Sequence, residues 1–479
     1  MKNLKHEIDL KAVKTIDAIL VTVPFAACWF LYYMPLIIKE DNFISKHLII
    51  VLFFLMYIMY GKVYDGFLVS YNRISEMIYS QILAFLITDG ISYIIICLMA
   101  GHLMWLVPGL LCIVGQVVVA GIWSVIAHKW YFKVFPPKRT IIIYDMRQGM
   151  ENLINEYGMS KKFKVIGTYK AEDCVDDLKK KLRRVECVFL CGVHSHERNI
   201  LLKYCVANNI RAYVIPRLGD SIMSGARTIH MFHLPMMWVG RYNPSPQFVI
   251  IKRMMDILIS GAAILILSPV MLITAICIKS DGGPVLYKQV RLTKDGKKFK
   301  VLKFRSMRVD AEKDGVARLS TGDKDDRITP VGHFIRKVRI DELPQLFNIL
   351  SGDMSIVGPR PERPEIAAQY EEVMPEFALR LQAKAGLTGL AQVYGQYNTT
   401  PYDKLNMDLM YIAQPSIMEE LRIIFATVKI LFMPESTEGI SEGHTTALEQ
   451  NIVDQNTNTT TYSDCKEDNQ ENNNEDISL

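Results

Sequence analysis

Four apolar stretches follow one another in the first third of the chain. Each is close to the roughly 20 residues that a helix needs to cross a bilayer. They cover Thr15 to Ile38, Ser45 to Tyr60, Ile78 to Ala100 and Leu103 to Ala127. We therefore predict a bundle of four transmembrane helices in residues 1–135. The third stretch carries Asp89, for which a contact inside the bundle is a better interpretation than a proton relay.

The lysines and arginines between these stretches predict the orientation of the bundle. They gather before the first span, between the second and third, and after the fourth: Lys2, Lys5, Lys11, Lys14, Lys62, Arg73, Lys129, Lys133, Lys138 and Arg139. Basic residues flank membrane spans on the cytoplasmic side. Both ends of the bundle should therefore lie in the cytoplasm, which predicts a multi-pass protein of the cytoplasmic (inner) membrane. No cleavable signal peptide is expected, because further spans follow the first one directly.

In residues 136–245 the pattern changes to short apolar strands that alternate with polar helices. The expected strands are Thr140 to Tyr144, Phe163 to Tyr169, Glu186 to Cys191 and Ile210 to Ile215, with a helix over Leu201 to Asn208. This order predicts an α/β, Rossmann-like domain. The first strand lacks a G-x-G-x-x-G loop after it, so a structural or regulatory role is a better interpretation than ordinary cofactor binding.

Two histidine clusters in this region are weak candidates for a metal site. They consist of Cys191, His194, His196 and Glu197, and of His230 and His233. The first cluster falls where a strand meets a helix, so loop polarity and helix capping explain it sufficiently. The nine cysteines of the chain form no C-x-x-C pair, which favours reduced thiols over disulfides or structural zinc.

A fifth apolar stretch, Ile257 to Ile278, is interrupted in its middle by Ser268 and Pro269. A proline inside a helix removes a hydrogen bond and bends the axis. Basic residues flank both ends of the stretch: Lys252, Arg253, Lys279, Lys288, Arg291, Lys294, Lys297, Lys298, Lys300 and Lys303. We therefore predict a re-entrant helix whose break is at Ser268 and Pro269, with Ser268 helping to satisfy the freed carbonyls. A fifth, kinked span is the alternative.

Composition agrees with a membrane protein of several domains. The chain has 479 residues, half of them hydrophobic, and a net charge of +5 that averages over strong local differences. Residues 435–479 are rich in Asn, Thr, Ser, Asp and Glu, and Lys466 is their only lysine or arginine. Such a segment cannot bury enough apolar surface to fold, so we expect a disordered acidic tail.

Candidate chemistry begins at Asp341 and Glu342, which precede Pro344 at the expected start of a helix. Neighbouring carboxylates repel one another, and a divalent cation brought by a phosphate substrate would hold them together. An acidic cap that only stabilises the helix explains the same spacing. The decision between the two depends on the residues that follow.

Arginines between prolines follow one helix later, in the segment G-P-R-P-E-R-P that contains Arg360 and Arg363. Prolines restrict the backbone around Arg360, which suits a guanidinium that grips phosphate. An isolated segment of this kind would be read as a solvated turn, but here it follows the acidic pair closely. The basic segment K-F-R-S-M adds Lys303 and Arg305 as candidates for phosphate binding, although a role in facing the membrane explains them comparably well. Nucleic acid is a weaker partner for these cations, because they adjoin a membrane anchor.

The run R-I-D-E-L-P-Q-L-F-N-I-L-S-G-D-M-S-I-V-G-P-R-P-E-R-P resembles the signature of the bacterial sugar transferase family, the monotopic polyprenyl-phosphate phosphoglycosyl transferases. The resemblance extends from about Arg253 to about Pro434, and the Rossmann-like region is similar to that of the longer members. It implies a multi-domain membrane protein: a transmembrane bundle, a Rossmann-like domain, and, in residues 246–434, a re-entrant helix with an α/β catalytic domain.

The resemblance also implies a reaction. Asp341 attacks a UDP-sugar, UMP leaves, and undecaprenyl phosphate takes the sugar phosphate, which starts assembly of a capsule, exopolysaccharide or O-antigen. Glu342 then holds Mg²⁺ or aids deprotonation of the acceptor, and Arg360 and Arg363 steady phosphates. Membrane lipids and a second copy of the chain, as a homodimer, are the other implied partners.

The motif G-L-T-G-L-A-Q-V, from Gly386 to Val393, also looks like the family, but Tyr394-Gly395-Gln396 follows it where relatives usually have Asn-Gly-Arg. No sugar preference can therefore be predicted. Asp408 and Tyr411 match a recurrent D-x-x-Y pattern and are either functional or structural. The competing hypotheses are a membrane-tethered nucleotide sensor or scaffold without catalysis, and a transporter with five spans.

Overall fold

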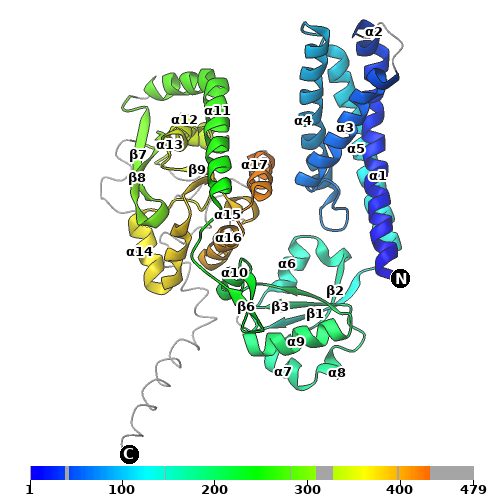
Figure 1. The fold of residues 1–479 in the computed structure, drawn as a ribbon, viewed down its shortest axis with the longest axis vertical. Coiled ribbons are helices and arrows are strands. Elements are labelled where there is room, and N and C mark those ends of the chain that lie inside the picture. Colours follow the sequence, from blue (N-terminus) through cyan, green and yellow to red (C-terminus); the bar gives the residue numbers. More distant parts are fainter. Residues whose placement is uncertain are drawn as a thin grey trace, which may run out of the picture. The chain divides into compact units, whose positions relative to one another are not determined.

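The computed structural model describes residues 2–37, 43–145, 147–280, 282–308, 327–395 and 399–431. The chain divides into two compact units, residues 1–215 and 216–479. The first unit holds the predicted bundle and a parallel sheet, and the second holds the fifth apolar helix and the carboxylate pair (Figure 1). The predicted acidic tail, residues 435–479, lies outside the described residues.

Long apolar helices form the N-terminal bundle. They are α1 (Lys2–Cys28), continued by a π-helical turn (Trp29–Tyr33) and α2 (Met34–Ile37), then α3 (Phe43–Val63), α4 (Ile74–Ala100) and α5 (Val107–Val134). Within the described residues, five helices are long and apolar enough to cross a membrane, and four of them belong to this bundle. The interpretation of Asp89 as a bundle contact is confirmed, because Gln116 Nε2 donates to its carboxylate at 3.4 Å.

A four-stranded parallel sheet with the strand order β2-β1-β3-β4 follows the bundle. Its strands are β1 (Lys138–Tyr144), β2 (Phe163–Lys170), β3 (Cys187–Cys191) and β4 (Arg211–Val214). The connecting helices are α6 (Met150–Glu156), a 3₁₀ turn (Met159–Lys161), α7 (Ala171–Asp176), α8 (Leu178–Lys181) and α9 (Ser195–Ala207). The predicted strands are confirmed to within a few residues. The apolar runs of β1 and β3 are buried in the middle of the sheet, whereas β2 and β4 at its edges are partly exposed.

The histidine cluster at the end of β3 has an ordinary explanation. His194 Nε2 lies 3.1 Å from the carboxylate of Asp145, the residue that follows β1. The carboxyl ends of parallel strands meet at one edge of a sheet, so β1 and β3 bring these two side chains together. Among the described residues, no group of three or more His, Cys, Asp or Glu side chains is arranged to hold a metal ion.

The sheet domain is joined to the bundle through the segment between α3 and α4. Lys162, which is only 6% exposed, donates to Ser70 Oγ at 3.3 Å and lies over the ring of Tyr71. Arg73 Nη2 donates to the carbonyl oxygen of Glu156 at 2.6 Å. The bundle and the Rossmann-like domain therefore share a buried polar contact.

The fifth apolar helix, α11 (Pro246–Ser280), belongs to the second unit and contains Pro269. Its ribbon changes direction before the chain reaches the next strand (Figure 1). Pro269 has no N–H to offer the carbonyl of Leu265, and Ser268 Oγ donates to that carbonyl at 2.9 Å instead. The predicted role of Ser268 is thereby confirmed.

Both ends of α11 pack on the same domain, whereas its middle is exposed and apolar. Near the N-terminal end, Asp256 accepts hydrogen bonds from Ser355 Oγ and the N–H of Ile356. Near the C-terminal end, Ile278 packs against Phe304 in the interior. Leu265 is 77% exposed in the segment between them. A helix that is tied down at both ends and apolar between them suits insertion into a membrane.

The rest of the second unit is built on short strands and helices around a large hydrophobic core and a smaller one that contains Ile278 and Phe304. After α11 come β7 (Leu286–Leu292), a 3₁₀ turn (Lys294–Gly296), β8 (Lys298–Phe304), α12 (Pro330–Lys337), the 3₁₀ turn η5 (Ile340–Glu342), α13 (Gln345–Ser351) and β9 (Ser355–Val357). They are followed by α14 (Pro364–Val373), η6 (Pro375–Gln382), β10 (Gly386–Thr388), α15 (Leu390–Tyr394), α16 (Pro401–Ala413) and α17 (Ile417–Leu431). Strands β7 and β8 pair antiparallel, and β9 pairs parallel with β10.

The boundary between the compact units lies at residue 215 rather than near residue 245, where the sequence pattern places it. The difference arises from α10 (Leu218–Met223), which packs on α16. Ser221 Oγ donates to Asn406 Oδ1 at 2.8 Å, and Asn406 Nδ2 donates to the carbonyl of Pro216 at 2.8 Å. The exposed hairpin of β5 (Arg227–Met231) and β6 (Leu234–Trp238) follows α10 in the second unit.

Candidate active site

The carboxylate pair lies in a tight turn at the head of a helix. Asp341 and Glu342 occupy η5, and α13 begins three residues later, after Pro344. The preceding residue, Arg339, has a left-handed backbone (φ 55°), which turns the chain from α12 into η5. The prediction that the pair precedes a proline-started helix is confirmed, with the difference that the pair itself forms a 3₁₀ turn.

Glu342 is held by cations from three parts of the domain. Its Oε1 atom lies 2.9 Å from Lys303 Nζ and 3.1 Å from Arg360 Nη2, and its Oε2 atom lies 4.0 Å from Arg339 Nη1. Burial alone would raise the pKa of Glu342, but these positive charges hold it well below the usual range. Glu342 is therefore a fixed anion in the centre of the site.

Asp341 is in a different electrostatic position from its neighbour. No hydrogen bond or ion pair joins its carboxylate to another residue of the described part of the chain. Burial, with the charge of Glu342 as the second cause, raises the pKa of Asp341 to about 6, although Lys303, Arg336 and Arg360 act in the opposite direction. At neutral pH the group is largely ionised and available to react.

The structure separates the two cations of the K-F-R-S-M segment. Lys303, near the end of β8, reaches Glu342. Arg305 is only 8% exposed and donates to the carbonyl oxygens of Ile278 and Gly282 at the end of α11. In a continuous strand, residues two positions apart lie on the same face, but β8 ends at Phe304, so Arg305 does not follow the direction of Lys303. The placement of Arg305 therefore does not support the proposed phosphate role.

The proline-flanked loop is fixed through its backbone. The carbonyl of Pro359 accepts from the N–H of Gly386 at 2.9 Å, and that of Arg360 accepts from Arg380 Nη2 at 2.9 Å. The carbonyl of Pro361 accepts from Arg291 Nη1 at 3.0 Å, and that of Glu362 from the N–H of Leu292 at 3.0 Å. The guanidinium of Arg360 can therefore face Glu342 from a rigid support. Arg363 forms the N-terminal cap of α14.

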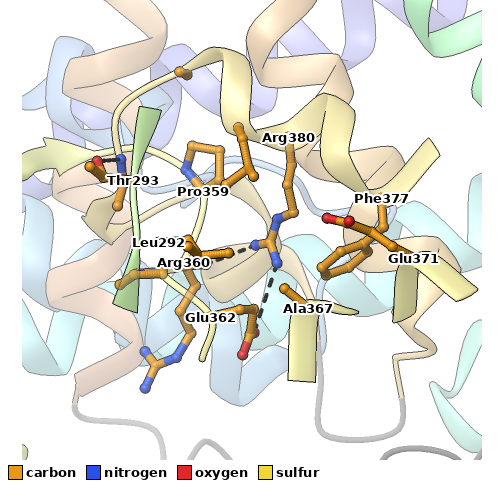
Figure 2. A pocket seen from close by; sticks show the side chains of 13 residues that line it. Leu292, Thr293, Pro359, Arg360, Glu362, Ala367, Glu371, Phe377 and Arg380 are labelled. Carbon is orange, nitrogen blue, oxygen red and sulfur yellow. Dashed lines mark hydrogen bonds and ion pairs between the residues drawn. The ribbon is translucent and has the colours of Figure 1, made fainter. Parts of the chain in front are cut away.

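Two arginines that contact this loop, Arg291 and Arg380, were not assigned to the site from the sequence, and Asp408 was interpreted there as either functional or structural. Arg380 Nη2 lies 2.7 Å from Asp408 Oδ2, and Arg380 Nη1 lies 3.8 Å from Glu362. Figure 2 shows the side chain of Arg380 directed toward the loop and Glu362. The pocket whose lining residues are drawn there includes Arg360 and Glu362 but not Asp341 or Glu342, so it is adjacent to the candidate site rather than part of it.

The D-x-x-Y pair has structural contacts. Asp408 binds Arg380, and the hydroxyl of Tyr411 donates to Glu420 at 2.6 Å in a buried group that also contains Lys252. Lys252 therefore belongs to the interior of the domain, although the sequence analysis counted it among the basic flanks of α11. Its neighbour Arg253 donates to the last carbonyls of α13, those of Ile349 and Leu350, at 2.7 Å each.

Comparison with known proteins agrees with this geometry. Residues 247–434, from α11 to just beyond α17, match the model of a family described as bacterial sugar transferase. The exopolysaccharide production protein PSS of Rhizobium leguminosarum bv. phaseoli is 44% identical over 190 residues, which cover 38% of this chain and 94% of that protein. The chain belongs to the bacterial sugar transferase family.

Other members of the family are similar over part of their length. A UDP-N-acetylgalactosamine-undecaprenyl-phosphate N-acetylgalactosaminephosphotransferase of Aeromonas hydrophila is 38% identical over 234 residues, 48% of this chain and 54% of that protein. A UDP-glucose:undecaprenyl-phosphate glucose-1-phosphate transferase of Klebsiella pneumoniae is 38% identical over 212 residues, 43% of each chain. The similarity thus spans about half the length of these two relatives, whose names specify different sugars.

Proposed function

We propose that this protein transfers a sugar 1-phosphate from a UDP-sugar to undecaprenyl phosphate. The observation that carries the proposal is the asymmetry of the carboxylate pair: Glu342 is fixed by Lys303 and Arg360, and Asp341 beside it has no such partner among the described residues. One carboxylate can organise charge while the other reacts. The names of the family members in Aeromonas and Klebsiella support the same reaction class.

The reaction takes place in two displacements. A carboxylate oxygen of Asp341 attacks the β-phosphorus of the UDP-sugar, the bond from that phosphorus to the bridging oxygen breaks, and UMP leaves. The phosphosugar is then an acyl phosphate on Asp341. A phosphate oxygen of the lipid attacks the same phosphorus, the bond to Asp341 breaks, and the lipid-linked diphosphosugar is released with the carboxylate restored.

The basic residues have separate tasks in this scheme. Lys303 and Arg360 approach Glu342 at the site where an anionic donor must bind, and they can shift their hydrogen bonds from the carboxylate to phosphate oxygens. Arg363, three residues after Arg360, is a second candidate for phosphate binding. Arg305 is proposed only as a support for the end of α11.

The two carboxylates of the site would also suit Mg²⁺ as ligands. Oε1 of Glu342 is contacted by two cations, whereas among the described residues Oε2 has only the longer contact with Arg339, and Asp341 is its neighbour. Mg²⁺ typically uses one or two carboxylates together with substrate phosphates. Glu342 is the residue that would hold the ion, which would neutralise charge on the pyrophosphate.

The membrane parts of the chain fit a lipid acceptor. The exposed apolar middle of α11 is proposed to dip into the cytoplasmic leaflet of the inner membrane and return, which would bring the site to the phosphate of the lipid. The product would begin a capsule, exopolysaccharide or O-antigen. A homodimer remains a prediction.

Release of UMP tests the proposal directly. Full-length protein with Mg²⁺ and undecaprenyl phosphate is incubated with a panel of UDP-sugars, and wild type is compared with Asp341→Asn. We expect release with at least one sugar and a loss of about 10³-fold or more in the variant. Absence of release with every sugar, from protein shown to be folded, would favour a nucleotide sensor or scaffold.

A further inference from the structure

Arg380 connects the loop that carries Arg360 to a buried carboxylate. Its side chain is 7% exposed, that of Asp408 is 2% exposed, and the two lie 2.7 Å apart. The same guanidinium donates to the backbone carbonyl of Arg360 at 2.9 Å. One planar group therefore joins Asp408, on α16, to the backbone from which the guanidinium of Arg360 extends.

The position of Arg360 depends on this backbone. Its own side chain is 43% exposed, and the contact with Glu342 at 3.1 Å is the hydrogen bond that directs it toward the carboxylate pair. A half-exposed arginine has many rotamers, so its direction is set largely by where its backbone is held. Figure 2 shows the side chain of Arg360 extending away from the loop, whereas that of Arg380 approaches the loop from η6.

We infer that Arg380, oriented by Asp408, is a positioning residue that fixes Arg360 toward Glu342. The inference rests on the proposed function, because it assigns Arg380 to the same site without any contact with the substrate. Arg380 also reaches Glu362 at 3.8 Å, and Glu362 in turn lies 3.6 Å from Arg291. The loop is therefore held between two arginines, of which only Arg380 has a fully buried counter-ion.

The geometry distinguishes arginine from lysine at this position. The guanidinium of Arg380 donates to the Arg360 carbonyl while it forms ion pairs with Asp408 and Glu362, whereas an ammonium on a flexible stem acts as a point charge. Arg380→Lys keeps the charge near Asp408 and loses the hold on the Arg360 carbonyl. Arg241→Lys is the matched control, because Arg241 forms an exposed ion pair with Asp295 at 2.6 Å.

A double-mutant cycle with Arg360→Ala tests the inference. UMP release by the full-length protein is measured for wild type, Arg380→Lys, Arg360→Ala and the double variant, and thermal unfolding is followed for each. We expect Arg380→Lys to lower kcat about tenfold or more, since a displacement of about 1 Å has that effect, with the KM for the lipid little changed. In the Arg360→Ala background the same substitution should cost less than about twofold, because it acts through Arg360.

The outcomes separate the inference from the function on which it rests. If the losses from Arg380→Lys and Arg360→Ala multiply, Arg380 acts independently of Arg360 and the inference is overturned. Asp408→Asn provides a second variant of similar size, and it should behave as Arg380→Lys does; full activity would count against the inference. If wild type itself releases no UMP, the proposed function fails and the inference falls with it.

Discussion

Ser268 Oγ donates to the carbonyl oxygen of Leu265 at 2.9 Å, at the place where Pro269 leaves that carbonyl without a helical partner. The carbonyl that is freed at the break in α11 therefore has a hydrogen-bond donor within the same helix. A carbonyl without a partner in hydrocarbon costs several kcal/mol, so a broken helix can enter a membrane only with such a replacement.

A re-entrant α11 predicts that both of its ends face the cytoplasm. Cysteines introduced at Gln247 and Lys279, in protein without its nine natural cysteines, should react with a membrane-impermeant maleimide only when the cytoplasmic face is accessible. The comparison is made in intact spheroplasts and inverted vesicles. Labelling of position 279 from the outer face would establish a fifth span instead.

Removal of Mg²⁺ should abolish UMP release, and its return should restore it. Because Glu342 is the proposed ligand, Glu342→Gln should raise the Mg²⁺ concentration for half-maximal rate by about tenfold or more. Glu365→Gln, at an exposed position in the first turn of α14, is the control. An unchanged requirement in Glu342→Gln would assign the metal to other groups.

Substitution of Lys303 should affect the reaction rate, whereas substitution of Arg305 should affect the stability of the fold. Lys303→Ala should lower the rate with little effect on unfolding, since Lys303 lies against Glu342 at the candidate site. Arg305→Ala should lower the free energy of unfolding by about 2–4 kcal/mol, because carbonyls at the end of α11 lose a buried charged donor. Thermal unfolding and UMP release are measured on both. A stable but inactive Arg305→Ala would restore the phosphate role.

Lys162 should make stability depend on pH. Burial, followed by the charges of Lys138 and Arg211, lowers the pKa of Lys162 to about 7, against about 10.4 in the unfolded chain. Between these values the unfolded state binds the extra proton, so stability should rise as pH rises from about 7 to about 10.4, and the full penalty applies below about 7.

Lys162→Met removes the titrating group and with it this dependence of stability on pH. The variant should therefore gain stability relative to wild type at pH 6 and lose that gain by pH 10, as measured by thermal unfolding. Lys164→Met, at an exposed position on β2, should show no such change with pH. A difference between wild type and Lys162→Met that stays constant from pH 6 to pH 10 would contradict the assignment.

Much of the fold could be predicted because its signals are local. The apolar runs of α4 and α5 are long enough to predict membrane-spanning helices, and the alternation of strands and helices in residues 138–214 is regular. The role of Ser268 followed from the chemistry of proline at the next position. Lys303 could be selected because it belongs to a compact basic motif.

The remaining parts depend on contacts between distant segments. Arg380 lies 28 positions before Asp408 and 20 after Arg360, and no spacing rule connects the three. Arg305 belongs to the same basic motif as Lys303, but it follows the end of β8 and its side chain contacts the end of α11. Residues 216–245 join the second unit through Asn406, a polar residue on a helix whose periodicity gives no sign of that contact.

The contacts of Lys252, Arg253 and Asp256 have a practical consequence for anyone who wants a water-soluble version of this domain. All three belong to the first turns of α11. Lys252 is the counter-ion of Glu420, Arg253 donates to carbonyls at the end of α13, and Asp256 accepts from the backbone of β9. In a chain that starts after Ser280, Glu420 would keep the Tyr411 hydroxyl but lose its counter-ion, and the end of α13 and the backbone of β9 would lose these side-chain partners. The apolar helix cannot be trimmed away as an anchor, because its polar residues are part of the domain's interior.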